Sequence, residues 1–199
     1  MALPARDAHL VQIVDAAVAD AAHRSGPWLK CAPGCTQCCI GVFPISQLDA
    51  ARLREGLAAL GSADPQRASA IRARAQQSVA RLAPDFPGDA VTGLIDEDRA
   101  DFDDFANDEH CPVLDPTTGL CDLYAARPMT CRVFGPPLRT EDGLGVCELC
   151  FVGATMEEIT AAEVHPEAEQ DDLESALTAE AEQATGHAGN TIVAWALVS

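Results

Sequence analysis

Nine cysteines are the residues in this sequence whose type and spacing could do chemistry. Four of them fall within nine residues, in the segment Cys31-Ala-Pro-Gly-Cys35-Thr-Gln-Cys38-Cys39. Because adjacent Cys38 and Cys39 point in divergent directions, four thiols packed this tightly cannot all pair with each other as disulfides. A metal can gather thiolates from such a loop, since tetrahedral sulfur ligation at roughly 2.3 Å needs only a turn that aims side chains inward. The segment therefore predicts a metal or iron–sulfur site.

A second group of cysteines follows much later in the chain. One tetrahedral zinc or one [4Fe–4S] cluster takes only about four thiolates, so nine cysteines imply two centres, one polynuclear centre, or one centre with bystander thiols. The last two form a C-x2-C pair, which could complete a site or a second one. The sequence leaves these alternatives open, and all nine cysteines are candidate ligands: Cys31, Cys35, Cys38, Cys39, Cys111, Cys121, Cys131, Cys147 and Cys150.

The second cysteine region contains the segments Cys111-Pro-Val-Leu and Gly119-Leu-Cys121-Asp-Leu-Tyr124-Ala-Ala-Arg127-Pro128-Met-Thr-Cys131-Arg132-Val-Phe134. Together with the first motif, these segments resemble the YkgJ-type cysteine-cluster family over about residues 31–151. The resemblance implies a zinc- or iron-chelating CxxCxxCC domain. Some relatives are labelled iron–sulfur oxidoreductases, and a similar cysteine pattern occurs in flagellin lysine methylases. The first motif departs from the family pattern by one residue, with three residues between Cys31 and Cys35, which leaves open whether Cys31 shares a centre with its neighbours.

Two arginines flank Cys131 and are candidate donors to a cofactor. Four thiolates around Zn²⁺ leave a net charge of about −2, which hydrogen bonds from nearby donors soften. We therefore expect Arg127 and Arg132 to contact the bound cofactor, with an ordinary ion pair to an acidic residue as the alternative for Arg127. His110 is a candidate nitrogen ligand, although a lone histidine is more often a surface or core residue. Tyr124 is expected in the core, with its hydroxyl hydrogen-bonded.

The chain is strongly acidic, with 31 acidic against 13 basic residues and a formal net charge of −18. Such a field repels phosphate backbones and anionic lipid, which disfavours binding to nucleic acid and to membrane surfaces. Eight carboxylates lie between Asp96 and His110, around Phe102 and Phe105. The simpler interpretation is an exposed acidic loop or short helix, and the alternative is a docking surface for a basic protein partner.

The sequence predicts a cytoplasmic protein. Residues 1–26 lack a basic start followed by an unbroken apolar stretch, and no later segment approaches the roughly 18 uncharged apolar residues that span a bilayer. Thiols stay reduced in the cytoplasm and are available to metal, and an odd number of cysteines fits that state better than a full disulfide set.

Apolar residues recur at helical spacing, which predicts a mainly α fold: a helical single domain with irregular cysteine-rich metal-binding loops. The length suits one domain, so we expect a single domain over 1–199, with its cysteine-cluster core at about residues 31–151 between N- and C-terminal helices. The segment from Pro84 to Gly93 is expected to be loop, and a short helical piece is expected near 122–127.

Capping residues mark the ends of the expected helices. The first spans about residues 7–24, and the second follows Ser46 with Gly61 as its C-terminal cap. The third begins at Asp64-Pro65, and a fourth begins at Thr155 and is interrupted or restarted by Pro166. The arginines of the third helix are expected to form a solvated face, with pairing to the surrounding acids as a further role: Arg67, Arg72, Arg74 and Arg81.

These features predict a metal-binding protein that holds zinc or an iron–sulfur cluster through clustered thiolates. Metal ligation would pin the two cysteine regions against the helices, so that binding free energy becomes folding free energy. The alternative is an iron–sulfur redox or protein-modifying enzyme of unknown substrate. The sequence indicates no catalytic residue, because it has no phosphate-cradling glycine-rich loop, no G-x-S-x-G and no H-E-x-x-H motif.

Overall fold

Helices dominate the part of the chain that the computed structural model describes, which is residues 2–99, 102, 104–140 and 143–198. Only two short antiparallel strand pairs accompany the helices in these residues, so the predicted mainly α fold is confirmed. Within the same residues, no helix combines the length and the apolar character that crossing a membrane requires. The α-helices are α1 (Asp7–Ser25), α2 (Gln47–Ala63), α3 (Pro65–Leu82), α4 (Met129–Val133), α5 (Met156–Ala161), α6 (Gln170–Thr185) and α7 (Val193–Ala196).

The chain divides into two compact units, which we describe separately. Unit 1 comprises Met1–Pro4, Gly34–Pro128 and Thr178–Ser199. Unit 2 comprises Ala5–Pro33 and Met129–Leu177. One division therefore falls inside α6, and another falls inside the first cysteine motif, between Pro33 and Gly34.

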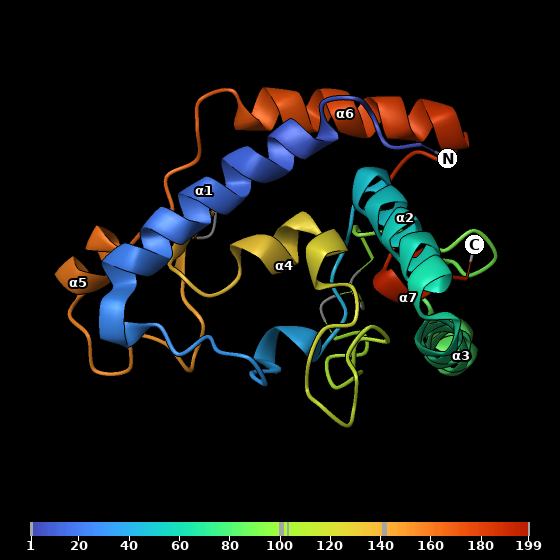
Figure 1. Cartoon of the computed structure of the whole chain (residues 1–199), viewed down its shortest axis with the longest axis horizontal. Coiled ribbons are helices and arrows are strands. Elements are labelled where there is room, and N and C mark those ends of the chain that lie inside the picture. The colour runs from blue at the N-terminus through green and yellow to red at the C-terminus, as the bar shows by residue number, and fades with distance from the viewer. Residues whose placement is uncertain (1, 100–101, 103, 141–142, 199) are drawn as a thin grey trace. The chain divides into compact units, whose positions relative to one another are not determined.

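In unit 1, α2 and α3 pack on each other and on α7 (Figure 1). Their buried face contains Leu53 of α2 and Ile71 of α3, each of which is worth about 2 kcal/mol when removed from water. Val113 and Leu123 belong to the same core cluster. These two residues are close in sequence to Cys111 and Cys121, so the core anchors the segments that contain these cysteines.

The predicted starts of α2 and α3 are confirmed by their caps. The Ser46 hydroxyl accepts a hydrogen bond from the Asp49 N–H at 3.1 Å, and the Asp64 carboxylate accepts one from the Arg67 N–H at 3.0 Å. The prediction that Gly61 ends α2 is wrong, because the helix continues to Ala63. The Asp64 N–H still bonds the Leu60 carbonyl at 2.6 Å, so no left-handed glycine is needed at Gly61.

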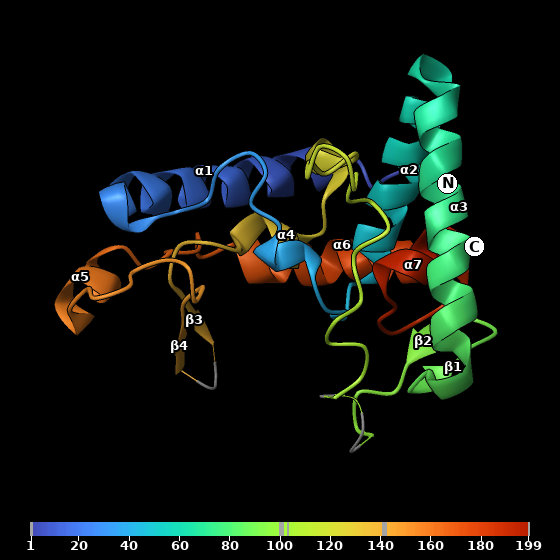
Figure 2. The ribbon, with the colours of Figure 1, turned by 90° about the horizontal axis from the view of Figure 1, so that it is seen from below.

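A short hairpin follows α3, and its first strand falls within the segment from Pro84 to Gly93, where the sequence predicts loop. Strand β1 (Gly88–Asp89) pairs antiparallel with β2 (Leu94–Ile95), and Figure 2 shows the pair near the end of α3. Trp195 of α7 covers the hairpin, since its indole N–H donates to the Ala90 carbonyl at 2.9 Å. Gly93 between the strands has a φ of +75°, and a Cβ there would come within 2.3 Å of the Trp195 ring. The turn therefore requires glycine.

The acidic segment between Asp96 and His110 is described only in part, because Asp101 and Asp103 lie outside the described residues. Phe105 packs edge to face against Phe86, with ring centroids 5.9 Å apart. It therefore anchors the segment to the core of unit 1, and the role of the segment in docking a basic partner stays a prediction.

In unit 2, α1 packs against α4 and α5 (Figure 1). The Arg132 side chain of α4 is 2% exposed, and its Nη1 donates to both carboxylate oxygens of Asp15 in α1 at 3.0 Å. Helix α5 begins with the predicted capping box, in which Thr155 and Glu158 exchange hydrogen bonds. Helix α5 ends at Ala161, before the predicted interruption at Pro166, and α6 begins only at Gln170. Strands β3 (Leu138–Thr140) and β4 (Gly143–Gly145) form the second hairpin.

Candidate metal centre

The two units divide the nine cysteines, none of which is in a disulfide bond. Among the described residues, no three or more cysteine, histidine or acidic side chains already stand in the arrangement of a complete metal site. A change of χ1 rotamer moves a cysteine sulfur by about 3 Å, so the backbone decides which thiols can converge. Unit 1 contains Cys35, Cys38, Cys39, Cys111 and Cys121, and unit 2 contains Cys31, Cys131, Cys147 and Cys150.

In unit 1, backbone pairing joins the end of the first cysteine motif to the start of the second. The N–H of Cys111 donates to the carbonyl of Cys39 at 2.8 Å. Ile40 pairs antiparallel with His110, which continues the same short ladder. Cys39 and Cys111, far apart in sequence, therefore lie on backbone segments that pair with each other.

The chain then turns back, which brings Cys121 beside the segment that begins at Cys111. Cys121 pairs antiparallel with Leu114, and the N–H of Asp122 donates to the carbonyl of Val113 at 2.9 Å. At the turn, a Cβ on Gly119 would lie 3.5 Å from the Cα of Gly34, the residue before Cys35. The turn that contains Cys35 thus lies beside the loop that leads to Cys121.

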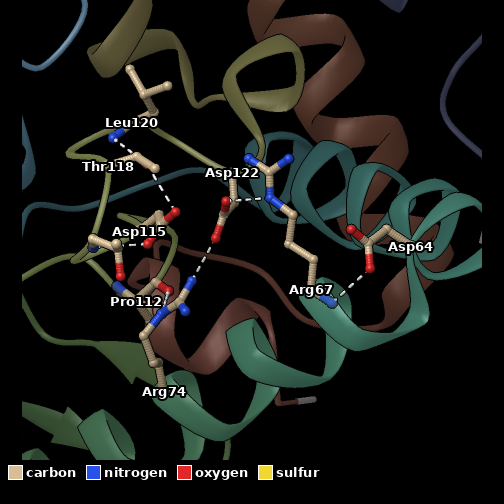
Figure 3. Close-up of polar contacts among 9 residues, drawn as sticks. Asp64, Arg67, Arg74, Pro112, Asp115, Thr118, Leu120 and Asp122 are labelled. Carbon is tan, nitrogen blue, oxygen red and sulfur yellow. Dashed lines mark hydrogen bonds and ion pairs between the residues drawn. The ribbon is translucent and has the colours of Figure 1, made fainter.

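Two arginines of α3 hold both cysteine-bearing segments (Figure 3). The Nε of Arg74 donates to the carbonyl of Pro112 at 2.8 Å, and its Nη2 donates to the Asp122 carboxylate at 2.6 Å. Arg67 donates to the other oxygen of the Asp122 carboxylate. The Asp122 side chain is only 2% exposed. Pro112 follows Cys111 and Asp122 follows Cys121, so these contacts fix the spacing of the two segments. Arg67 is exposed, as the sequence predicts, and it pairs with an acid. Arg74 is part-buried rather than solvated, because helical spacing alone does not reveal a buried acid from a distant loop.

The loop between Cys111 and Cys121 is held by its own carboxylate, Asp115. The N–H of Thr117 and the hydroxyl of Thr118 donate to it at 2.9 and 2.8 Å (Figure 3). These hydrogen bonds, led by the one from the Thr117 N–H, hold the pKa of Asp115 below its ordinary value. The Asp115 N–H in turn bonds the Leu120 carbonyl at 2.9 Å, which closes the loop just before Cys121.

The thiols of unit 1 influence one another electrostatically. A hydrogen bond from the Cys39 thiol lowers the pKa of Cys38 to about 6, and it correspondingly raises the pKa of Cys39. Burial raises the pKa of Cys111 to about 12, with a further contribution from Cys121 and Cys38. Burial also raises the pKa of Cys121. Because each thiolate opposes ionisation of the next, a bound cation is what would allow several of them to ionise together.

Arg127 acts electrostatically on two thiols of unit 1, and its contact with a bound cofactor stays a prediction. Its charge lowers the pKa of Cys38 and of Cys121, after the larger effects of hydrogen bonding and burial. Its guanidinium sits 4.0 Å from the centroid of the Tyr124 ring and donates to the Tyr124 carbonyl at 3.0 Å. The prediction of Tyr124 as a core residue is wrong, since it is 64% exposed and forms this surface stack.

Other predicted site residues take different places. Arg132 is in unit 2, where it pairs with Asp15, and its contact with a cofactor stays a prediction. His110 belongs to the ladder beside Cys39, but its side chain is exposed, and its role as a ligand is likewise a prediction. The sequence analysis did not assign Asp122 or Arg74 to the site. The only local indication is that Asp122 directly follows a cysteine.

The donor set of unit 1 suits a soft metal. Thiolates favour zinc, Cu(I) or iron–sulfur clusters, whereas Mg²⁺ and Ca²⁺ prefer oxygen ligands. The sequence model of one protein family, CxxCxxCC, described as a "putative zinc- or iron-chelating domain", matches residues 30–150. No match was found among curated proteins or among solved structures.

Proposed function

Because the chain belongs to the CxxCxxCC family of zinc- or iron-chelating domains, we propose that unit 1 holds zinc or an iron–sulfur cluster on its cysteine thiolates. The observation that supports this proposal most is the hydrogen bond from the Cys111 N–H to the Cys39 carbonyl, which joins the two cysteine motifs. A tetrahedral site or a [4Fe–4S] cluster takes about four thiolates, so one of five would remain unbound. The proposed ligands are drawn from Cys35, Cys38, Cys39, Cys111 and Cys121.

The protonation of these thiols supports the same function. The lowered pKa of Cys38 favours its thiolate, whereas the raised pKa values of Cys39 and Cys111 favour their protonated thiols. Metal ligands must be deprotonated, so uptake of metal releases protons from this site. Arg127, beside Cys38 and Cys121, offsets part of the negative charge that remains.

In this proposal, the bound group also stabilises the fold of unit 1. Cys111 and Cys121 pack against the core cluster that contains Leu53 and Ile71, while Cys38 and Cys39 belong to a one-turn 3-10 helix, Gln37–Cys39. Ligands from both places connect the turn to the helical core. The free energy of metal binding is therefore added to the free energy of unfolding.

The test is anaerobic purification of the full chain, followed by metal analysis and a visible spectrum. An iron–sulfur centre would give a brown protein whose absorption is bleached by dithionite, and zinc would give a colourless one. The double variant Cys38→Ser/Cys111→Ser should lose the metal of unit 1 and unfold at a lower temperature.

Ile40→Ala is the matched control, because Ile40 follows Cys39, is 39% exposed and has no thiol. It should keep its full metal content. If the double variant also kept its full metal content, the proposed ligands would be wrong.

A further inference from the structure

Cys147 and Cys150 of unit 2 lie on one turn. The N–H of Cys150 donates to the carbonyl of Cys147 at 2.8 Å. The C-x2-C spacing is the one by which structural zinc sites present two thiolates from a single turn. Cys150 is buried beside Phe151, and Cys147 packs against the same cluster. The turn is thus held in place from one side.

The segment that leads to Cys31 runs along this turn. The N–H of Phe151 donates to the carbonyl of Trp28 at 3.1 Å. The N–H of Lys30, the residue directly before Cys31, lies 3.4 Å from the Cys150 sulfur and donates to it. Backbone N–H groups that donate to sulfur are typical of metal-bound thiolates, whose charge they tune. The residue directly before Cys31 therefore contacts the Cys150 sulfur.

Cys31 also contacts the segment that follows Cys131. A Cβ on Gly135 would lie 2.8 Å from the Cys31 sulfur, so the Gly135 backbone touches this side chain. Gly135 comes two residues after the end of α4 (Met129–Val133), the helix that contains Cys131. Its φ of +127° and this close contact both require glycine.

Helix α4 itself is held within unit 2. Arg132, adjacent to Cys131, bonds both carboxylate oxygens of Asp15 in α1, and its side chain is buried. This pair limits rotation of the short helix, which lies beside α1 in Figure 1. Cys131 is accordingly presented from a fixed position on α4.

From these contacts we propose that unit 2 contains a second thiolate site, separate from that of unit 1, for a Zn²⁺ ion or a [4Fe–4S] cluster. This second proposal rests on the proposed function in one respect, that the chain binds metal through thiolates. The irregular spacing between Cys31 and Cys35 follows from this division, because the two residues serve different centres. The ligands of the second site are Cys31, Cys131, Cys147 and Cys150.

The test measures metal per chain in the full-length protein, both as purified anaerobically and after the metal-free protein is loaded with Co²⁺. Thiolate-bound Co²⁺ is coloured, so it reports ligation as well as stoichiometry. The wild-type protein should bind about two equivalents of Co²⁺, one for each set of about four thiolates. Cys147→Ser/Cys150→Ser and Cys38→Ser/Cys111→Ser should each bind about one.

Cys31→Ser distinguishes the two sites. This exposed residue belongs to the same sequence motif as Cys35, but it lies in unit 2, whereas Cys35 lies in unit 1. Added to Cys147→Ser/Cys150→Ser, it should cause no further loss of Co²⁺. Added to Cys38→Ser/Cys111→Ser, it should weaken or abolish binding of the remaining equivalent. Circular dichroism of each variant checks that its helices persist.

Leu149→Ser is the matched control, since Leu149 is 44% exposed and lies between Cys147 and Cys150. It should keep both equivalents. The second site is excluded if Cys147→Ser/Cys150→Ser binds as much Co²⁺ as wild type, or if this variant loses all of it. Full retention by Cys38→Ser/Cys111→Ser would instead contradict the proposed site of unit 1.

Discussion

Arg74 and Asp122 form an ion pair that sets the distance between two cysteine-bearing segments. The Nη2 of Arg74 donates to the Asp122 carboxylate at 2.6 Å, and its Nε donates to the Pro112 carbonyl at 2.8 Å (Figure 3). Asp122 directly follows Cys121, and Pro112 directly follows Cys111. One guanidinium thus holds both candidate ligands against α3, in a fork geometry that a lysine could not reproduce.

We predict that Arg74→Met lowers the free energy of unfolding by about 1–3 kcal/mol, the usual worth of hydrogen bonds to charged groups. It should also speed the release of metal to a chelator, because the Cys111 and Cys121 segments lose their common support. Urea unfolding and a chelator competition assay measure the two effects. Arg72→Met, at an exposed position of the same helix, should change neither. Equal effects of both substitutions would show that the Asp122 pair has no special role.

Cys38 should be the most reactive thiol of the metal-free protein near neutral pH. Its pKa of about 6 makes it a thiolate at about pH 7, whereas burial leaves Cys111 protonated. Alkylation with iodoacetamide, followed by peptide mass spectrometry, should label Cys38 first and Cys111 last. The rate at Cys38 should fall as the pH drops below about 6.

The variant Cys39→Ala removes the thiol that donates to Cys38. It should therefore raise the pKa of Cys38 and slow its alkylation at about pH 7. If the rate at Cys38 in the wild-type protein rose only near the pKa of an ordinary thiol, the hydrogen bond from Cys39 would be ruled out.

Glu109 should make the stability of unit 1 depend on pH in the acidic range. Burial alone would raise its pKa, but hydrogen bonds from Arg81 and Ser78 outweigh burial and hold the pKa below its ordinary value. The unfolded chain therefore binds the proton more readily. The stabilising effect is present above the ordinary pKa of a glutamate and is lost as the pH falls through the lower pKa of the folded state.

Urea unfolding at about pH 7 and about pH 3 should therefore show a smaller loss of stability for Glu109→Gln than for wild type. Glu55→Gln, at an exposed position of α2, serves as the control and should follow the wild-type profile. An unchanged pH dependence in Glu109→Gln would exclude Glu109 as a contributor.

Gly135→Ala should disturb the proposed site of unit 2. The added methyl group would lie 2.8 Å from the Cys31 sulfur and would push that side chain away. Gly153→Ala is a matched control, because Gly153 also has a positive φ but has no atom within 4 Å of its Cβ position. Backbone strain should cost both variants about 1 kcal/mol, measured by thermal unfolding. Only Gly135→Ala should also lose metal, and equal metal content in the two variants would argue against the role of Cys31.

We expect the metal-loaded chain to unfold as one domain despite its two compact units. The chain passes from one unit to the other after Pro4, Pro33, Pro128 and Leu177, and α6 continues across the last of these points. Differential scanning calorimetry should give a single transition in which the calorimetric and van't Hoff enthalpies agree. Two separated transitions would indicate two domains.

Local patterns in the sequence were sufficient for the family and for most helices. Thiol spacing predicts soft-metal ligation whatever the fold, and capping at Ser46, Asp64 and Thr155 depends on residues within three positions. Helix α4 was not predicted, because five residues are too few to show a period.

Long-range contacts decided how the cysteines are grouped and what supports them. The extra residue between Cys31 and Cys35 only left open whether they act together, whereas the tertiary structure places them in different compact units. Likewise, Arg74 looks like any exposed helix arginine until the chain returns with Asp122. The physical reason is that spacing along the chain specifies only neighbours within a turn or two, whereas backbone pairing and buried ion pairs join residues at any separation.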